Sequence, residues 1–425
     1  MPTLAGLAIA LIFVSLNYRA YDGFFQDDEF DNISWAPYVT VSEFAVAFVK
    51  PLFDVSNVRP AGHLYFALMG RWFGESFPPW MTPIFAIHLI NGFLIFLLLR
   101  RLRVGPWHAL AGVAFFLWSA AAFDAYWKPM YVFDLLCACF SLVSILLYSR
   151  RRWVLSFLAF WCAYKSKELA VMLPLALVAW EYWFGEKRYW RLLPFALVSL
   201  SFGLQGILRN PNEDNEYTFR FTPAALRATV PFYAHRFLQF QGSGLLLIAL
   251  AFVRDRRVWF GLTAGACFLF TLLFLPGRLY EAYAYLPLAC IAIALAGASA
   301  RVRPVWAWVA LALWMPANIH QLRMEQRAKL AADDAIFAFV DSIDQWAPGH
   351  PTVTTLVFDG LPDRFHHWGA TAAWNIAHHA LGLHAYYYDS PDAKEAMAHG
   401  TVAYGEWDAG KAILHLSQRS AGAKN

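Results

Sequence analysis

The sequence predicts a polytopic all-α membrane protein with about 11 transmembrane helices. Hydrophobic residues make up 59% of the 425 residues and charged residues only 15%, whereas a soluble domain carries about 25% charged residues. The apolar residues form long segments separated by short basic clusters, the pattern of a chain that crosses a membrane repeatedly. Because the positive charges gather in these short loops, we expect no nucleic-acid partner.

The predicted transmembrane segments follow the apolar runs. They lie at 3–19, 80–99, 107–123, 130–148, 153–164, 167–184, 193–208, 241–253, 258–275, 285–299 and 305–319. Five basic clusters in alternate connections hold 14 of the 34 Lys and Arg residues, at 100–103, 150–152, 187–191, 254–257 and 301–303. The positive-inside rule places these clusters and the N-terminus in the cytoplasm. The loops 20–79, 209–240 and 276–284 and everything after residue 320 then face outside, which for a bacterial inner membrane is the periplasm.

The segment 153–184 admits two interpretations. It is either one long buried helix or two short spans that meet at 165–168. One span would put the basic clusters 150–152 and 187–191 on opposite faces of the membrane. Two spans keep the alternation of charge, so we predict two.

The first outer loop and the tail carry the remaining structure. Within the loop, 41–53 and 60–72 read as amphipathic juxtamembrane helices, whose aromatic residues suit a membrane surface. In the tail, 352–358 reads as a strand, 370–381 as a helix, and 401–404 with 412–416 as a hairpin. We therefore predict a transmembrane domain over 1–320 and a small outer α/β appendage over 321–425.

Four acids stand directly after the first apolar segment: Asp27, Asp28, Glu29 and Asp31. Carboxylates this close repel one another and are tolerated if they hold a cation, share a proton or face water. A loop needs no such density for capping, so we expect these acids to take part in chemistry.

Further polar residues are predicted on the same outer face. Charged side chains beside membrane spans are costly, so each is a functional hypothesis. Converging acids could bind a hydroxyl or a metal, and converging bases a phosphate. These residues are Arg59, His63, Lys165, Lys167, Glu168, Arg278, Tyr280 and Tyr283.

At these residues the chain resembles GT-C glycosyltransferases. Asp27-Asp28 is similar to the acidic motif in the first outer loop of protein O-mannosyltransferases, lipid A aminoarabinose transferases and transmembrane tetratricopeptide-containing mannosyltransferases. Four patches resemble the last group: Asn-Val-Arg-Pro at 57–60, Tyr-Val-Phe-Asp-Leu-Leu at 131–136, Lys-Ser-Lys-Glu at 165–168 and Tyr-Leu-Pro at 285–287. The resemblance covers 1–320, and no tetratricopeptide repeat follows it.

The resemblance implies a GT-C-like fold and a function. A polyprenyl-phosphate-linked sugar would be the donor, a glycan, lipid or protein the acceptor, and the displacement at the anomeric carbon would be inverting. Asp27, with Asp28 close behind, is the expected general base. The expected ligands of the donor phosphate are Arg59, Lys165, Lys167 and Arg278. Asp28 or Glu29 could hold Mg or Mn, which the family does not uniformly require.

Each of these residues also has a simpler interpretation. The acids could be a solvated loop, Arg59 a headgroup anchor, and the lysines snorkelling side chains. Asp134, inside the fourth span, reads as a helix–helix hydrogen bond. The tail histidines are interpreted as ordinary surface residues, because adjacent histidines do not share a helix face; they are His366, His367, His378, His379 and His384.

Three alternative functions stay open at this point. A transporter or flippase of a lipid-linked sugar would need broken helices and charges near the membrane midplane. An O-antigen ligase or polymerase would carry its charges mainly in large late loops. A non-catalytic lipid-binding relative would be expected to lack the acidic pair, which is present here.

Overall fold

The protein is described from a computed structural model that covers residues 2–53, 58–209, 214–239 and 243–420. Asn57, in the first resemblance patch, lies outside these residues. The chain divides into two compact units. We call the first, formed by 1–18, 44–62 and 82–323, the helical unit. The second, formed by 19–43, 63–81 and 324–425, is the sheet unit; its last segment begins close to the predicted boundary at residue 320.

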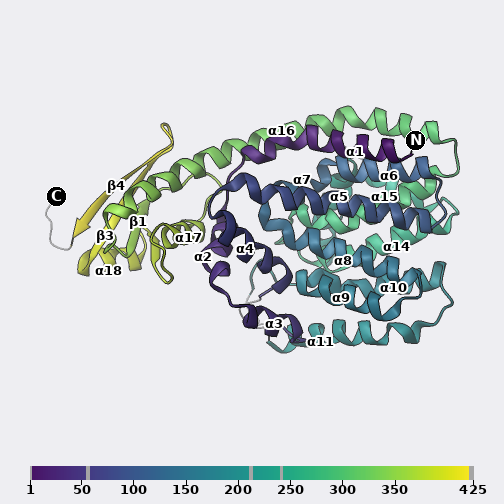
Figure 1. The fold of residues 1–425 in the computed structure, drawn as a ribbon, viewed down its shortest axis with the longest axis horizontal. Coiled ribbons are helices and arrows are strands. Elements are labelled where there is room, and N and C mark those ends of the chain that lie inside the picture. Colours follow the sequence, from purple (N-terminus) through teal and green to yellow (C-terminus); the bar gives the residue numbers. More distant parts are fainter. Residues whose placement is uncertain (1, 54–57, 210–213, 240–242, 421–425) are drawn as a thin grey trace. The chain divides into compact units, whose positions relative to one another are not determined.

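Helices account for most of the chain, as expected (Figure 1). The α-helices outside the tail are α1 Pro2–Asn17, α2 Asp27–Trp35, α3 Val41–Val49, α4 Pro60–Phe73, α5 Phe77–Arg101, α6 Pro106–Trp118, α7 Phe123–Trp127, α8 Val132–Ser149, α9 Trp153–Ser166, α10 Leu173–Trp183, α11 Leu193–Arg209, α12 Pro223–Leu238, α13 Ser243–Ala251, α14 Arg256–Phe270, α15 Tyr285–Ser299 and α16 Pro304–Trp346. Short 3₁₀ helices join them: η1 Tyr18–Asp22, η2 Ala36–Tyr38, η3 Ala120–Ala122, η4 Pro129–Tyr131, η5 Glu168–Met172, η6 Tyr189–Leu192, η7 Leu272–Phe274, η8 Glu281–Ala284 and η9 Ala347–Gly349. Each of the eleven predicted segments contains a helix.

The core of the helical unit is built around α15. This helix packs against α6, α8 and α14 (Figure 1), and most of its side chains are buried. A helix that is apolar on every side belongs in the centre of a bundle. At Gly261 of α14 a Cβ would come within 2.6 Å of the Cys290 carbonyl oxygen of α15, so a small residue allows these two helices to approach closely.

Several helices of this unit suit a lipid environment. Within the described part of the chain, four stretches are long and apolar enough to cross a membrane: Pro2–Asp22, Phe77–Arg101, Pro129–Ser149 and Glu281–Ser299. α6 with the helices after it would make a fifth that bends by 52°. On α11, one exposed stripe consists of leucines at helical spacing: Leu193, Leu197, Leu200, Leu204 and Leu208. The chain is therefore an integral membrane protein, while the full number of eleven spans stays a prediction.

The region 153–184 contains a break, as predicted. α9 ends at Ser166, Lys167 is extended, and η5 leads into α10. The sequence thus forms two helices here and not one. The amphipathic helices predicted in the first loop also form, as α3 and α4.

The tail of the sheet unit folds around a four-stranded sheet in the order β2-β1-β3-β4 (Figure 1). β1 (Thr355–Asp359) is parallel to β2 (His384–Tyr387) and to β3 (Thr401–Asp408), and β3 pairs with β4 (Ile413–Ser420) as the predicted hairpin. In β1, Val357 lies opposite Tyr386 on one side and Tyr404 on the other. Two helices, α17 (His367–Ala377) and α18 (Pro391–His399), complete this part. The predicted α/β character of the tail is confirmed.

Three expectations about the loops were wrong. The acidic stretch after the first segment is not a loop, because its acids begin helix α2. The predicted loop 209–240 contains α12, although its polar residues Asn210, Asn212 and Glu213 lie outside the described residues. The helix of the final predicted span does not end near 319, because α16 continues to Trp346.

The close approach of α14 to α15 gives a first prediction. Gly261→Ala would push a methyl group against the backbone of α15 and should destabilise the protein by about 1–3 kcal/mol, lowering the thermal midpoint in detergent. Gly203→Ala on α11 is the matched control. A Cβ there meets open space, so this variant should be neutral or slightly stabilising. Equal midpoints for the two variants would contradict the packing.

Candidate functional site

The acidic stretch forms the first turn of α2, where Gln26 is the N-cap. The Gln26 backbone N–H donates to Glu29 Oε2 at 2.7 Å, closing a capping box in which Glu29 is buried. Asp27 and Asp28 precede Glu29 in the same turn, where the helix dipole favours negative charge. Part of the acid density therefore has a structural cause, and Glu29 is a capping residue.

The chain entering α2 is held by Asp333, a buried residue of α16. Its carboxylate accepts the backbone N–H of Phe24 and the side-chain amide of Gln26, each at 3.1 Å. Nothing in the sequence connects Asp333 with the acidic stretch, which lies about three hundred residues earlier. This anchor fixes the position at which α2 begins within the sheet unit.

Asp27 is bound by His366, the residue that precedes α17. The His366 backbone N–H donates to Asp27 Oδ1 at 2.7 Å, and His366 Nδ1 lies 2.7 Å from Asp27 Oδ2. Burial raises the pKa of Asp27, while the two contacts with His366 oppose this shift; the net direction is upward. His366 is therefore not the ordinary surface histidine that was predicted.

Asp28 and the start of α17 complete this contact. The Trp368 indole N–H donates to Asp28 Oδ1 at 3.2 Å, and the Trp368 ring stacks on the ring of His366 at 4.4 Å. At Gly369 a Cβ would come within 2.5 Å of Asp27 Oδ1. A glycine thus lets α17 lie against α2 closely enough for both aspartates to be bound. We call Asp27, Asp28, His366 and Trp368 the carboxylate site.

His63 also belongs to the sheet unit. It is buried, and its ring contacts Trp35 edge-to-face at 4.8 Å, where α2 ends. Asp31, one turn into α2, has a raised pKa because of burial and the nearby charge of Asp28. His63 and Asp31 therefore both lie at α2, whereas Arg59, another predicted residue of the first loop, belongs to the helical unit.

The predicted phosphate ligands lie in the helical unit, and each is bound to an acid or to aromatic rings. Lys167 Nζ donates to both carboxylate oxygens of Asp134 at 2.6 Å. Arg59 Nε donates to Glu168 Oε1 at 2.7 Å. Both pairs are largely buried, and the hydrogen bond expected for Asp134 is an ion pair with Lys167.

Tyrosines connect these pairs to Arg278. Lys167 Nζ lies 4.3 Å from the ring centre of Tyr283, whose hydroxyl accepts Arg278 Nη2 at 3.1 Å. Arg278 also donates to Glu216 at 2.6 Å and lies over the ring of Tyr280 at 4.6 Å. Five predicted residues from distant parts of the chain are thus joined with Asp134. We call the group the cation cluster: Arg59, Lys167, Glu168, Arg278, Tyr283 and Asp134.

Lys165 has different surroundings from Lys167. Its side chain is fully buried, and its Nζ lies 4.6 Å from the ring centre of Phe53, 5.2 Å from that of Tyr164 and 5.4 Å from that of Trp161. Aromatic faces stabilise a desolvated ammonium group. The two lysines of the 165–168 motif therefore do not act as one pair.

Sequence reasoning missed a further ion pair of this unit. Arg236 of α12 is buried and pairs with Glu281, and it donates to the Ala120 carbonyl at 3.1 Å. Its only signal in the sequence was a charged residue in an apolar helix. With Glu216 counted, three carboxylates face the three cations of the cluster, and Arg236 is paired with Glu281. An incoming phosphate would therefore compete with carboxylates that already bind the cations.

The arrangement of acids around α2 gives little support for a bound metal ion. Among the described residues, no three His, Cys, Asp or Glu side chains lie close enough together to hold an ion. Of the two expected oxygen ligands, Glu29 is committed to the helix cap, and Asp28 binds Trp368. The residues present therefore do not fit a divalent cation at this position.

Comparison with known proteins supports the fold. The sequence matches no protein-family profile, and no curated protein is similar to it in sequence. The structure is similar to a crystal structure of ArnT from Cupriavidus metallidurans bound to undecaprenyl phosphate, with a TM-score of 0.58, 13% identity, and coverage of 95% of this chain and 92% of that one. The apo state of the same protein gives a TM-score of 0.53 at 12% identity and covers 93% of this chain and 92% of that one. The expected GT-C fold is confirmed.

The cation cluster gives a second prediction. Lys167→Met leaves the Asp134 carboxylate buried without its cation and should cost about 3–5 kcal/mol of stability. The double variant Lys167→Met/Asp134→Leu removes both charges and should regain most of that loss in a thermal unfolding assay. The exposed pair Arg220–Asp214 serves as control, and Arg220→Gln should cost about 0–1 kcal/mol. If the double variant loses as much stability as Asp134→Leu and Lys167→Met lose together, the two side chains do not interact.

Proposed function

We propose that this protein is a glycosyltransferase that moves a sugar from a polyprenyl-phosphate donor to an acceptor hydroxyl. The likeness to a protein crystallised with undecaprenyl phosphate, which extends over almost the whole chain, supports a lipid-phosphate donor. The observation that carries the proposal is the carboxylate site, in which Asp27 is part-buried and held by His366.

The proposed reaction is a single inverting displacement. Asp27 takes the proton of the acceptor hydroxyl, whose oxygen then bonds to the anomeric carbon while the bond from that carbon to the donor phosphate oxygen breaks. The bonding electrons leave with the lipid phosphate, so the reaction balances without an oxidant or a second cofactor. Asp28 is the alternative base, since it stands beside Asp27 and accepts the Trp368 indole N–H through one carboxylate oxygen.

His366 positions the base. Its two contacts hold both oxygens of Asp27, which fixes the direction of the carboxylate and leaves the outward lone pairs as proton acceptors. Partial burial raises the pKa of Asp27, and a higher pKa makes a carboxylate a stronger base as long as it stays ionised at the working pH.

We assign the stabilisation of the leaving phosphate to the cationic residues of the helical unit. Arg59, Lys167 and Arg278 supply hydrogen-bond donors that stabilise charge developing on a phosphate, and Lys165 adds a buried ammonium group. Exchange of carboxylates for the phosphate keeps the charge balanced while the donor is bound. Glu168, Tyr280 and Tyr283 hold these side chains in place. Mg or Mn is assigned no step, because Asp28 and Glu29 do not fit an ion.

The localisation follows from the same assignment. We infer an integral protein of a bacterial inner membrane, with the N-terminus cytoplasmic and the tail periplasmic. The basic clusters support this orientation through the positive-inside rule.

The base assignment gives a third prediction. Asp27→Asn keeps the size of the side chain but cannot accept the proton, so turnover should fall by about 10²–10⁴-fold. Transfer is measured with purified protein and a polyprenyl-phosphate sugar, and donor affinity is measured separately. Donor affinity should be unchanged in this variant. Normal turnover by Asp27→Asn and by Asp28→Asn would contradict the assignment of the carboxylate site.

His366 gives a fourth prediction, on pH dependence. The His366 side chain lowers the pKa of Asp27, so His366→Ala should raise that pKa further. The base must be ionised, hence the rising limb of the rate against pH should move to higher pH, with the plateau also reduced by loss of positioning. His367→Ala, whose ring contacts Trp368 and Tyr387, is the control and should leave the limb in place. An unshifted limb in His366→Ala would refute the positioning role.

A further inference from the structure

A second polar site lies in the helical unit, at the basic clusters that were assigned only to membrane topology. A cavity of about 680 Å³ opens where four connections meet: α5–α6, α8–α9, α10–α11 and α13–α14. None of the residues assigned to the donor lines it. Seven arginines do: Arg101, Arg103, Arg151, Arg191, Arg254, Arg256 and Arg257.

The charge of the cavity is not balanced. Three carboxylates face the seven arginines, which leaves an excess of four positive charges. The helices α5, α8 and α10 end at the cavity, and each C-terminus contributes about half a negative charge. The beginning of α14 contributes about half a positive charge. An excess of about three positive charges remains, enough to bind a phosphate.

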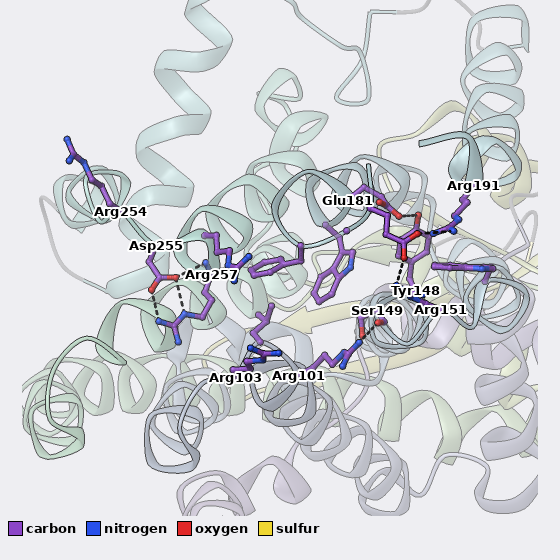
Figure 2. Close-up of a pocket in the computed structure, with 17 residues that line it drawn as sticks. Arg101, Arg103, Tyr148, Ser149, Arg151, Glu181, Arg191, Arg254, Asp255 and Arg257 are labelled. Carbon is purple, nitrogen blue, oxygen red and sulfur yellow. Dashed lines mark hydrogen bonds and ion pairs between the residues drawn. The ribbon is translucent and has the colours of Figure 1, made fainter. Parts of the chain in front are cut away.

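Part of the basic lining is already fixed by hydrogen bonds (Figure 2). Arg257 grips Asp255 with two bonds of 2.9 and 2.6 Å, and Arg101 donates to the Ser149 carbonyl at 2.6 Å. Figure 2 shows Arg101 and Arg103 between the Asp255–Arg257 pair on one side and the group around Glu181 and Arg191 on the other. Arg101, Arg103 and Arg257, which come from two different connections, therefore lie near one another, whereas the side chain of Arg254 points away from them.

Other donors in the lining remain available. Arg191 donates to Glu186 through Nη2 at 3.2 Å, and its Nη1 is buried with no hydrogen-bond partner. Arg103 and Arg256 form no ion pair with any described carboxylate, and Arg256 lies over the Phe184 ring at 5.3 Å. A buried donor left unpaired costs free energy unless a ligand or water satisfies it.

The backbone adds an independent argument. Arg103 and Arg151 have φ angles of 59° and 60°, the left-handed conformation that follows many helices and favours glycine. Both helix ends close with the typical bonds, from the Val104 N–H to the Leu99 carbonyl and from the Arg152 N–H to the Leu147 carbonyl. Membrane topology requires a positive charge somewhere in each connection. It does not require one at the position where a side chain is strained by about 1 kcal/mol relative to glycine.

We propose that this cavity binds the phosphate group of an organic phosphate anion. Guanidinium groups bind phosphate oxygens bidentately, and the volume is in the range of a small-molecule site and larger than an inorganic ion needs. The rings of Trp153, Trp180 and Phe184 offer apolar surface to the organic part. Basic pockets between helices on a cytoplasmic face bind anionic lipid headgroups. A soluble phosphate ester has the same chemistry, so the experiment distinguishes the two sources.

The test compares two double variants of purified protein. Arg103→Gln/Arg256→Gln removes two exposed cavity arginines, whereas Arg152→Gln/Arg303→Gln removes two equally exposed arginines that do not line the cavity. Native mass spectrometry in detergent measures how many phosphatidylglycerol molecules stay bound to each protein, with phosphatidylcholine as the comparison lipid. Thermal stabilisation by glycerol 3-phosphate measures the soluble source.

We expect the cavity variant to bind one of these probes about tenfold more weakly than wild type, and the control variant to bind it normally. If the cavity variant loses binding of phosphatidylglycerol, the cavity is a lipid site. If it loses binding of glycerol 3-phosphate, the cavity is a site for a soluble ligand. The proposal is overturned if wild type binds neither probe, or if both variants lose binding equally, since general surface charge would then explain the effect. Sugar transfer is not part of the readout, so failure here leaves the proposed function untouched.

Discussion

A charge that is removed from water needs a partner, and the helical unit depends on this constraint. The contact between Lys167 and Asp134 shows how it is met. Two charges this deeply buried lose several kcal/mol of hydration each, and only close, hydrogen-bonded pairing offsets the loss. Arg59 with Glu168 and Arg236 with Glu281 obey the same rule. A chain this apolar can keep charged side chains among its helices because each carries its own counter-charge or an aromatic enclosure, as Lys165 does. In the proposed function, such a cluster exchanges its carboxylates for the phosphate of the donor.

In the sheet unit, a partly buried carboxylate meets the same constraint through hydrogen bonds and a helix N-terminus. Asp27 is only part-buried, and a histidine together with a helix N-terminus suffices to hold it. The close packing at Gly369 brings that histidine into range, and Asp333 fixes the segment that enters α2. The outcome is a carboxylate with a raised pKa and a fixed direction, two properties that a general base needs. The basic cavity is the exception among these sites, since its arginines outnumber the carboxylates that face them, and an external anion is the natural partner.

Local patterns in the sequence predicted most of the secondary structure. Apolar runs located the helices, and the strand predicted at 352–358 overlaps the inner strand β1. The sequence predicted a loop where α2 forms, because Gln26, which caps the helix through its contact with Glu29, is not one of the residue types preferred at an N-cap. Contacts between distant residues were beyond reach: His366 lies 339 positions from Asp27, and no local pattern connects them. The ion pair of Asp134 was not predicted, because its partner, Lys167, lies in the break between α9 and η5, 33 residues further along the chain. Hydropathy fixed the segments but not the number of spans, since several helices are shorter than the roughly 20 residues that cross a membrane.

Mass spectrometry of the envelope glycans and glycolipids tests the central claim most directly, by comparing wild-type cells, a deletion strain and a strain with Asp27→Asn. The account predicts that one sugar modification is absent from both mutant strains, which would also identify the sugar and its acceptor. If the deletion alters the envelope and Asp27→Asn does not, the protein transports or scaffolds a lipid-linked sugar, and the account of the carboxylate site is wrong.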